Sequence, residues 1–201
     1  MLDGLNKSID VQLEVFEKII SKNKKLMKIL DILELYALEN PRFKNWYVGA
    51  GGVNQTVFNY YHGYESDYGI KDYDIVYFDE DTSYEAEDVI IKDLEKRLKD
   101  IDIVSDIKNQ ARVHIWYNPK YGTDREAYTS CEDAVSSWGS TVTCIGIRKE
   151  NGKLVVYCPY GLNDLFSLTI RPVKRYFDKE SYVERCKRWK AKWEKLNIVE
   201  W

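Results

Sequence analysis

The sequence is poor in histidine and cysteine, the residues that build many transition-metal and redox sites. It has two histidines and four cysteines in 201 residues. The cysteines are too far apart along the chain for a paired zinc knuckle or a CxxC redox pair. We therefore expect reduced cysteines that pack as small apolar side chains. They are Cys131, Cys144, Cys158 and Cys186.

Long apolar runs and an excess of positive charge are also absent. Charged residues interrupt the apolar stretches around Ile19 and Val156, so none reaches the ~20 residues of a membrane span. The N-terminal residues lack a signal-peptide pattern, and we expect a cytoplasmic protein without a membrane segment. A formal net charge of −3, from 30 basic and 33 acidic residues, does not favour a protein whose main task is to grip nucleic acid. The basic segment 185–192 could still form a local patch.

The spacing of apolar residues predicts an α+β fold. Helical spacing is found over 8–38, with a break near the lysines at 22, 24 and 25, and over 54–61, 84–98 and 179–196. Strands are predicted at 46–48, 73–78, 104–107, 111–117, 141–148 and 154–158, with an Asn-Gly hairpin turn at 151–152. We expect a mixed, mainly antiparallel β-sheet flanked by α-helices, in one domain over 1–201. A helical segment over about 1–40 would precede a core over about 46–172 and a C-terminal helix over about 179–196.

Two aspartates at the start of the clearest strand carry the strongest chemical signal. Side chains two apart on a strand point to the same face, so Asp72 and Asp74 project together. Two adjacent carboxylates repel each other unless a cation lies between them. Mg²⁺ is typically held by one or two carboxylates together with substrate phosphates. The pair is therefore predicted to bind Mg²⁺ or Mn²⁺ and to be catalytic; a solvated strand end is the alternative.

A glycine run precedes these aspartates, between a predicted strand and a predicted helix. Gly49, Gly51 and Gly52 leave backbone N–H groups unobstructed by Cβ atoms. Together with the positive end of a helix, such a turn can hold phosphate oxygens. Glycines after one strand and paired aspartates on the next form a constellation typical of nucleotide chemistry.

These blocks resemble a bacterial nucleotidyltransferase family of the DNA polymerase β-like superfamily. The likeness extends in the family's order over most of the chain between 46 and 172. Its blocks are 46–52, 56–58, 62–63, 72–79, 108–114, 132–134 with Trp138, 141–148, 159–166 and 171–172.

The resemblance implies a fold like the head domain of CCA-adding enzymes. It also implies a divalent metal on the paired aspartates and a nucleoside triphosphate (NTP) as donor. It implies no acceptor, which can be a small molecule, RNA or protein. The chain departs from the family pattern at Asn54 and Asn59, where Arg and Asp are expected, and in an apparent inserted loop over 60–70.

Other charged residues are weaker candidates for the site. Lys108 and Arg112 are predicted to contact the triphosphate because cationic side chains bind phosphate; a salt-bridged sheet surface is the alternative. Arg148 and Arg171 rank below them. The predicted strand near residue 111 supplies no carboxylate, so a possible third carboxylate is Asp133 or Asp164. His62 and His114 are expected to be structural.

The leading hypothesis is transfer of a nucleoside monophosphate from an NTP to an acceptor hydroxyl, with release of pyrophosphate. A rival hypothesis is a nucleotide-binding or regulatory protein, such as a toxin–antitoxin component, that kept the fold and lost turnover. A third is an RNA-binding helper that uses the basic C-terminal helix.

Overall fold

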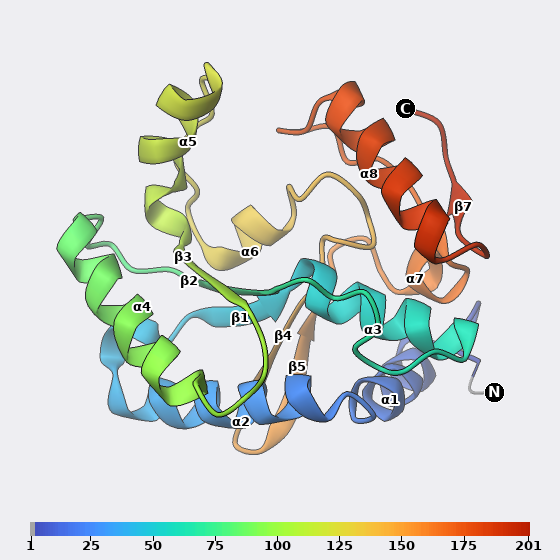
Figure 1. The fold of residues 1–201 in the computed structure, drawn as a ribbon, viewed down its shortest axis with the longest axis horizontal. Helices are drawn as coiled ribbons and strands as arrows, with labels where there is room; N and C mark the ends of the chain where they lie inside the picture. The colour runs from blue at the N-terminus through green and yellow to red at the C-terminus, as the bar shows by residue number, and fades with distance from the viewer. Residues whose placement is uncertain (1–2) are drawn as a thin grey trace.

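The computed structural model describes residues 3–201, which form a central β-sheet surrounded by helices (Figure 1). In chain order the elements are α1 (Ile9–Ile20), α2 (Lys24–Glu39), η1 (Pro41–Phe43), β1 (Trp46–Gly49), α3 (Ala50–His62), β2 (Tyr73–Tyr77), α4 (Tyr84–Leu98), β3 (Ser105–Asn109), η2 (Gln110–Arg112), α5 (Val113–Tyr121), α6 (Cys131–Val135), β4 (Gly146–Glu150), β5 (Lys153–Tyr157), α7 (Asn163–Phe166), β6 (Thr169–Ile170), α8 (Lys179–Lys192) and β7 (Asn197–Ile198).

The main sheet has five strands in the order β3-β2-β1-β4-β5. Strand β2 runs parallel to β3, whereas β1–β2, β1–β4 and β4–β5 are antiparallel. The predicted mixed, mainly antiparallel sheet is therefore confirmed. Its register places Gly49 opposite Asp74, and Asp74 beside Asp106 of β3.

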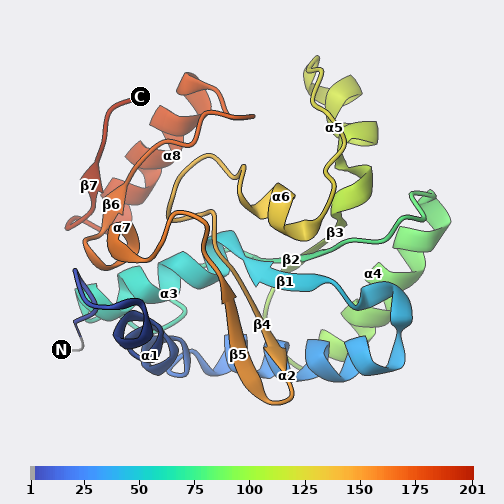
Figure 2. The same ribbon diagram turned by 180° about the vertical axis from the view of Figure 1, so that it is seen from behind.

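The two faces of the sheet have different surroundings. Alternate residues of β2, including Ile75 and Tyr77, pack into the main core with α1, α2 and α4. The opposite face carries Val76 and Tyr47, which pack against α6. Helices α1 and α2 lie beyond the first face, while α5 and α8 lie on the other side of the sheet with α6 between them (Figures 1 and 2). Asp72 and Asp74 share their parity with Val76 and so belong to this second side.

Helix boundaries follow local capping. The predicted break near residue 22 is confirmed, because α1 ends at Ile20 and the Asn23 side chain accepts a hydrogen bond from Leu26 N–H as the cap of α2. Helix α3 begins at Ala50, four residues earlier than predicted. The glycine run is therefore the first turn of this helix. Ala50 takes a left-handed φ of 44° to make the change from strand to helix.

Two predicted strands were wrong in whole or in part. The segment 111–117 is helical, because Asn109 accepts a hydrogen bond from Ala111 N–H and starts η2, which continues into α5. Only the end of the segment 141–148 is strand, since β4 begins at Gly146. Before it, hydroxyl groups of Ser140 and Thr143 hydrogen-bond to each other and to local backbone, which competes with sheet formation.

Helix α8 is fixed to α3 by a buried polar contact. Trp193, the residue that follows α8, donates its indole N–H to Asn59 Oδ1 at 2.7 Å. The Asn59 amide nitrogen donates to the carbonyl oxygens of Ser66 and Tyr68, at 3.2 and 2.9 Å. Both atoms of the Asn59 amide therefore hold the segment 63–70 and the C-terminal helix in place. The departure at Asn59 thus has a structural role.

The four cysteines are free; Cys131, Cys144 and Cys186 are buried and Cys158 is half-buried. Their expected packing role agrees with this placement. Within residues 3–201, every helix is too short or too polar to cross a bilayer.

Candidate active site

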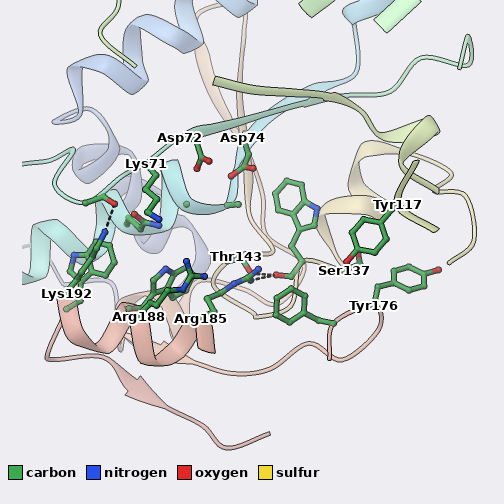
Figure 3. A pocket seen from close by; sticks show the side chains of 18 of the residues that line it. Lys71, Asp72, Asp74, Tyr117, Ser137, Thr143, Tyr176, Arg185, Arg188 and Lys192 are labelled. Atoms are coloured by element: carbon green, nitrogen blue, oxygen red, sulfur yellow. Dashed lines mark hydrogen bonds between the residues drawn. The ribbon is translucent and has the colours of Figure 1, made fainter. Parts of the chain in front are cut away.

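A cavity of about 850 Å³ lies between the sheet and α8 (Figure 3). Asp72 and Asp74, at the start of β2, project into it from the sheet. Ala50 and Gly51, in the first turn of α3, line the same wall. The sequence therefore brings the predicted aspartates and one of the predicted glycines to a single site.

Asp74 is the more constrained of the two aspartates. Burial raises its pKa to about 7, and the negative charges of Asp72 and Asp106 add to this effect. The positive charge of Arg185 and a hydrogen bond from Gly51 N–H lower the pKa, but by less. Among residues 3–201, neither Asp72 nor Asp74 forms an ion pair within 4 Å. The pair thus carries negative charge that no neighbouring cation of the protein neutralises directly.

The raised pKa gives a pH-dependent stability prediction. A folded-state pKa of about 7, against an ordinary 3.8, means that the native state binds more protons, so the free energy of unfolding falls as pH rises between about 4 and 7. Asn cannot ionise, so Asp74→Asn should escape this loss. We expect its melting temperature, relative to wild type, to be higher at pH 8 than at pH 5 without added metal. The same difference in melting temperature at both pH values would contradict the raised pKa of Asp74. Asp102→Asn, which removes an exposed carboxylate, is the control.

The three predicted glycines have different neighbours. A Cβ atom on Gly49 would lie 2.5 Å from the Trp138 ring, and one on Gly52 would lie 2.6 Å from the Tyr73 ring. Gly51 lines the cavity, and a Cβ there would meet only the end of the Gln55 side chain, at 2.9 Å. Gly49 and Gly52 therefore allow close packing, and Gly51 is the glycine placed to face a ligand.

Substitutions at Gly52 and Gly51 should therefore have different effects, the first on protein stability and the second on ligand binding. We expect Gly52→Val to lower the free energy of unfolding by about 1–3 kcal/mol, because the new side chain overlaps the buried Tyr73 ring. Gly51→Ala should retain most of the stability, because the flexible Gln55 side chain can move. Thermal melting and NTP titration of both variants would test this. A Gly52→Val variant with wild-type melting would show that the site tolerates a side chain there.

Four cationic side chains line the same cavity as the aspartates. Lys71 precedes the pair, and Arg185, Arg188 and Lys192 project from α8 (Figure 3). Among residues 3–201, none of the four has an ion-pair partner within 4 Å. Burial lowers the pKa of Arg185, and the charge of Arg188 acts in the same direction. Arg185 donates a hydrogen bond to the Trp138 carbonyl oxygen at 3.3 Å, and Lys192 donates one to the Gly69 carbonyl oxygen at 3.1 Å. Cations that gather in one cavity without carboxylate partners favour a polyanionic ligand.

The comparisons with known proteins agree with this geometry. The sequence model of a family described as nucleotidyltransferase matches residues 37–198. The chain belongs to this nucleotidyltransferase family. A solved structure, described as an NMR structure that reveals a CCA-adding enzyme head domain, has the same fold with a TM-score of 0.73 and 22% identity, over 100% of both chains. No curated protein sequence matches the chain.

The cations that line the cavity are not those predicted from the sequence. Lys108 pairs with Asp106, and Arg112 forms a buried ion pair with Glu87. Neither side chain lines the cavity. Both form salt bridges, which was the alternative to triphosphate contact in the sequence analysis. The weaker candidates Arg148 and Arg171 also lie outside it. The basic segment 185–192 was the sequence signal for the cations of α8, but nothing local indicated which site they would face.

The predicted third carboxylates are engaged elsewhere. Asp133 pairs with Arg175, and Asp164 pairs with Arg171; neither lines the cavity. On β3, Asp106 lies in register beside Asp74, but it pairs with Lys108 and does not line the cavity. The sequence interpretation missed it because it sought the carboxylate near residue 111, in a segment that is helical.

The structural role expected for His62 agrees with its contacts. Its Nδ1 atom lies 2.7 Å from the Phe58 carbonyl oxygen, and its Nε2 atom accepts a hydrogen bond from Lys195 N–H at 3.1 Å. His114 lies in α5, and neither histidine lines the cavity.

Proposed function

We propose that the protein transfers a nucleoside monophosphate from an NTP to an acceptor hydroxyl and releases pyrophosphate. The observation that carries this proposal is the distribution of charge in the cavity, where carboxylates and cations lie together without pairing. Two carboxylates without ion-pair partners lie on the sheet side, and four cations without ion-pair partners lie around them. Metal-bound triphosphate has the complementary charges, since a divalent cation would compensate the carboxylates and the phosphates would compensate the lysines and arginines.

The carboxylates suit Mg²⁺ or Mn²⁺. Residues 3–201 contain no cluster of three His, Cys, Asp or Glu side chains arranged to hold a metal ion. Asp72 and Asp74 would therefore be the protein ligands, and water and triphosphate oxygens would complete the coordination, as Mg²⁺ prefers. A cation bound there would stabilise the charged form of Asp74, whose pKa is raised by burial and by the neighbouring carboxylates Asp72 and Asp106. Asp106 would add negative charge from the neighbouring strand.

The triphosphate would lie between the first turn of α3 and the cations of α8. Backbone N–H groups at a helix start favour phosphate oxygens, and Gly51 allows close approach there. Lys71, Arg188 and Lys192 would hold the β- and γ-phosphates and stabilise the departing pyrophosphate. Arg185, opposite Asp74, would lie nearest the α-phosphate.

In the reaction, the acceptor oxygen forms a bond to the α-phosphorus as the bond from phosphorus to the bridging oxygen breaks. A bound divalent metal would polarise the α-phosphate and lower the pKa of the attacking hydroxyl. The protein's own contribution is to position the two reactants and neutralise developing charge.

The proposal is tested by incubating the protein with each labelled NTP, Mg²⁺ and a cell extract. Pyrophosphate release together with a labelled product is expected, and the product's susceptibility to nuclease or protease would assign the acceptor to RNA, protein or small molecules. Lys71→Ala/Arg188→Ala should raise the KM for NTP, because two phosphate contacts are removed. Labelling that is unchanged in this variant would contradict the assigned phosphate site.

A specific observation favours the rival binding or regulatory role. Asn54 replaces an expected Arg, and its buried amide has no hydrogen-bond partner among residues 3–201. A protein that lost turnover would bind NTP tightly and show no labelled product with any extract fraction. The RNA-binding alternative predicts retention on RNA that falls steeply with salt, yet three cations of α8 face the cavity.

A further inference from the structure

The end of the cavity beyond the aspartates is built from aromatic side chains. Tyr117 comes from α5, Trp138 from the loop after α6, and Tyr176 and Phe177 from the segment before α8. All four are half-buried. These rings pack against core clusters and also line the cavity. Aromatic rings in such a position are suited to stacking with a planar ligand.

Arg125 holds this aromatic end in place. Its guanidinium lies 3.7 Å from the centre of the Tyr117 ring and 4.8 Å from the centre of the Tyr176 ring. It donates hydrogen bonds to the Tyr128 hydroxyl at 3.1 Å and to the Tyr176 carbonyl oxygen at 3.2 Å. The Tyr128 hydroxyl in turn contacts Ser137 Oγ at 2.8 Å. Because one side chain ties three separate segments together, the rings are positioned before any ligand binds.

The order of groups along the cavity matches the order of groups in a nucleotide. Lys71 and Lys192 lie at one end, the two aspartates lie between, and Tyr117 and Tyr176 lie at the other end (Figure 3). In an NTP the α-phosphate likewise separates the β- and γ-phosphates from the nucleoside. A volume of about 850 Å³ is within the ~300–1,000 Å³ of sites that enclose a small ligand.

We propose that this aromatic end is the subsite for the nucleobase of the donor NTP. The inference rests on the proposed function, because it takes the triphosphate to lie at the basic end. Stacking accepts every base, but a purine covers more aromatic surface than a pyrimidine. Purine NTPs are therefore the expected donors.

The test compares an NTP with a ligand that has the phosphates and no base. Calorimetry with Mg²⁺ would measure the affinities of ATP, GTP, CTP, UTP and inorganic tripolyphosphate for wild type, Tyr176→Ala and Tyr176→Phe. We expect Tyr176→Ala to weaken purine NTP binding about 10-fold and to leave tripolyphosphate binding unchanged. Tyr176→Phe, which keeps the ring, should bind like wild type. Tyr84→Ala, at an exposed tyrosine outside the cavity, is the matched control.

The outcomes separate this inference from the function on which it rests. If wild type binds tripolyphosphate and NTPs equally well, the base makes no contact and the subsite is overturned, while the triphosphate site stands. If Tyr176→Ala loses both ligands equally, the ring is structural and the subsite is again overturned. If neither ligand binds wild type, the proposed function itself fails.

Discussion

Asp74→Asn is expected to reduce nucleotidyl transfer by about 10²–10³-fold, while the protein remains folded. The carboxylate would act on charge that develops at the α-phosphate through a bound metal, and removal of one preorganised group of this kind typically costs about that much in rate. The measurement is initial-rate pyrophosphate release at saturating Mg²⁺ and NTP, with thermal melting to confirm folding. Asp72→Asn should behave in the same way.

The same assay distinguishes the candidate third carboxylates. Asp106→Asn should lower the rate if the β3 carboxylate contributes to the site, because Asp106 lies in register beside Asp74. Asp133→Asn and Asp164→Asn are matched controls. Like Asp106→Asn, each removes an ion-paired carboxylate that does not line the cavity, but neither residue lies in register with Asp74. A loss in the controls equal to that in Asp74→Asn would contradict the placement of the catalytic centre.

Asn59→Asp is expected to lower the free energy of unfolding by about 3–5 kcal/mol. Asp has nearly the same shape but no N–H group, so the carbonyl oxygens of Ser66 and Tyr68 would lose their donor. The new carboxylate would also be buried, with the Trp193 indole as its remaining donor. Urea unfolding of wild type and variant would measure the difference. Asn151→Asp, in the exposed hairpin turn, should cost little, and a wild-type midpoint for Asn59→Asp would contradict the role of this contact.

The predictions that succeeded from sequence rest on residues close together along the chain. The shared direction of Asp72 and Asp74 follows from strand geometry alone. The turn from β1 into α3 follows from the glycine run, although the helix start was placed four residues late. The hairpin between β4 and β5 follows from its Asn-Gly turn. Each of these three predictions depends on the backbone conformation that a few neighbouring residues prefer.

The position of the α8 cations in the cavity depends on contacts between distant parts of the chain, which no local sequence pattern encodes. Arg185 and Arg188 line the same cavity as the aspartates because α8 packs onto α3 through Trp193 and Asn59, which are far apart in sequence. Asp106 was missed for a different reason. The strand predicted at 104–107 corresponds to β3. The carboxylate was sought in the segment 109–112 instead, where Asn109 starts a helical turn.

The division of the site between the sheet and α8 has a consequence for synthesis of the protein. The aspartates and the glycine turn precede Arg185, Arg188 and Lys192 of α8 along the chain. Translation proceeds from the N-terminus, so the carboxylates are made long before the side chains that face them. A chain that stopped before α8 would keep both acidic residues and lose three of the four cations around them. The proposed triphosphate site would therefore form only after α8 has been made and has packed onto α3.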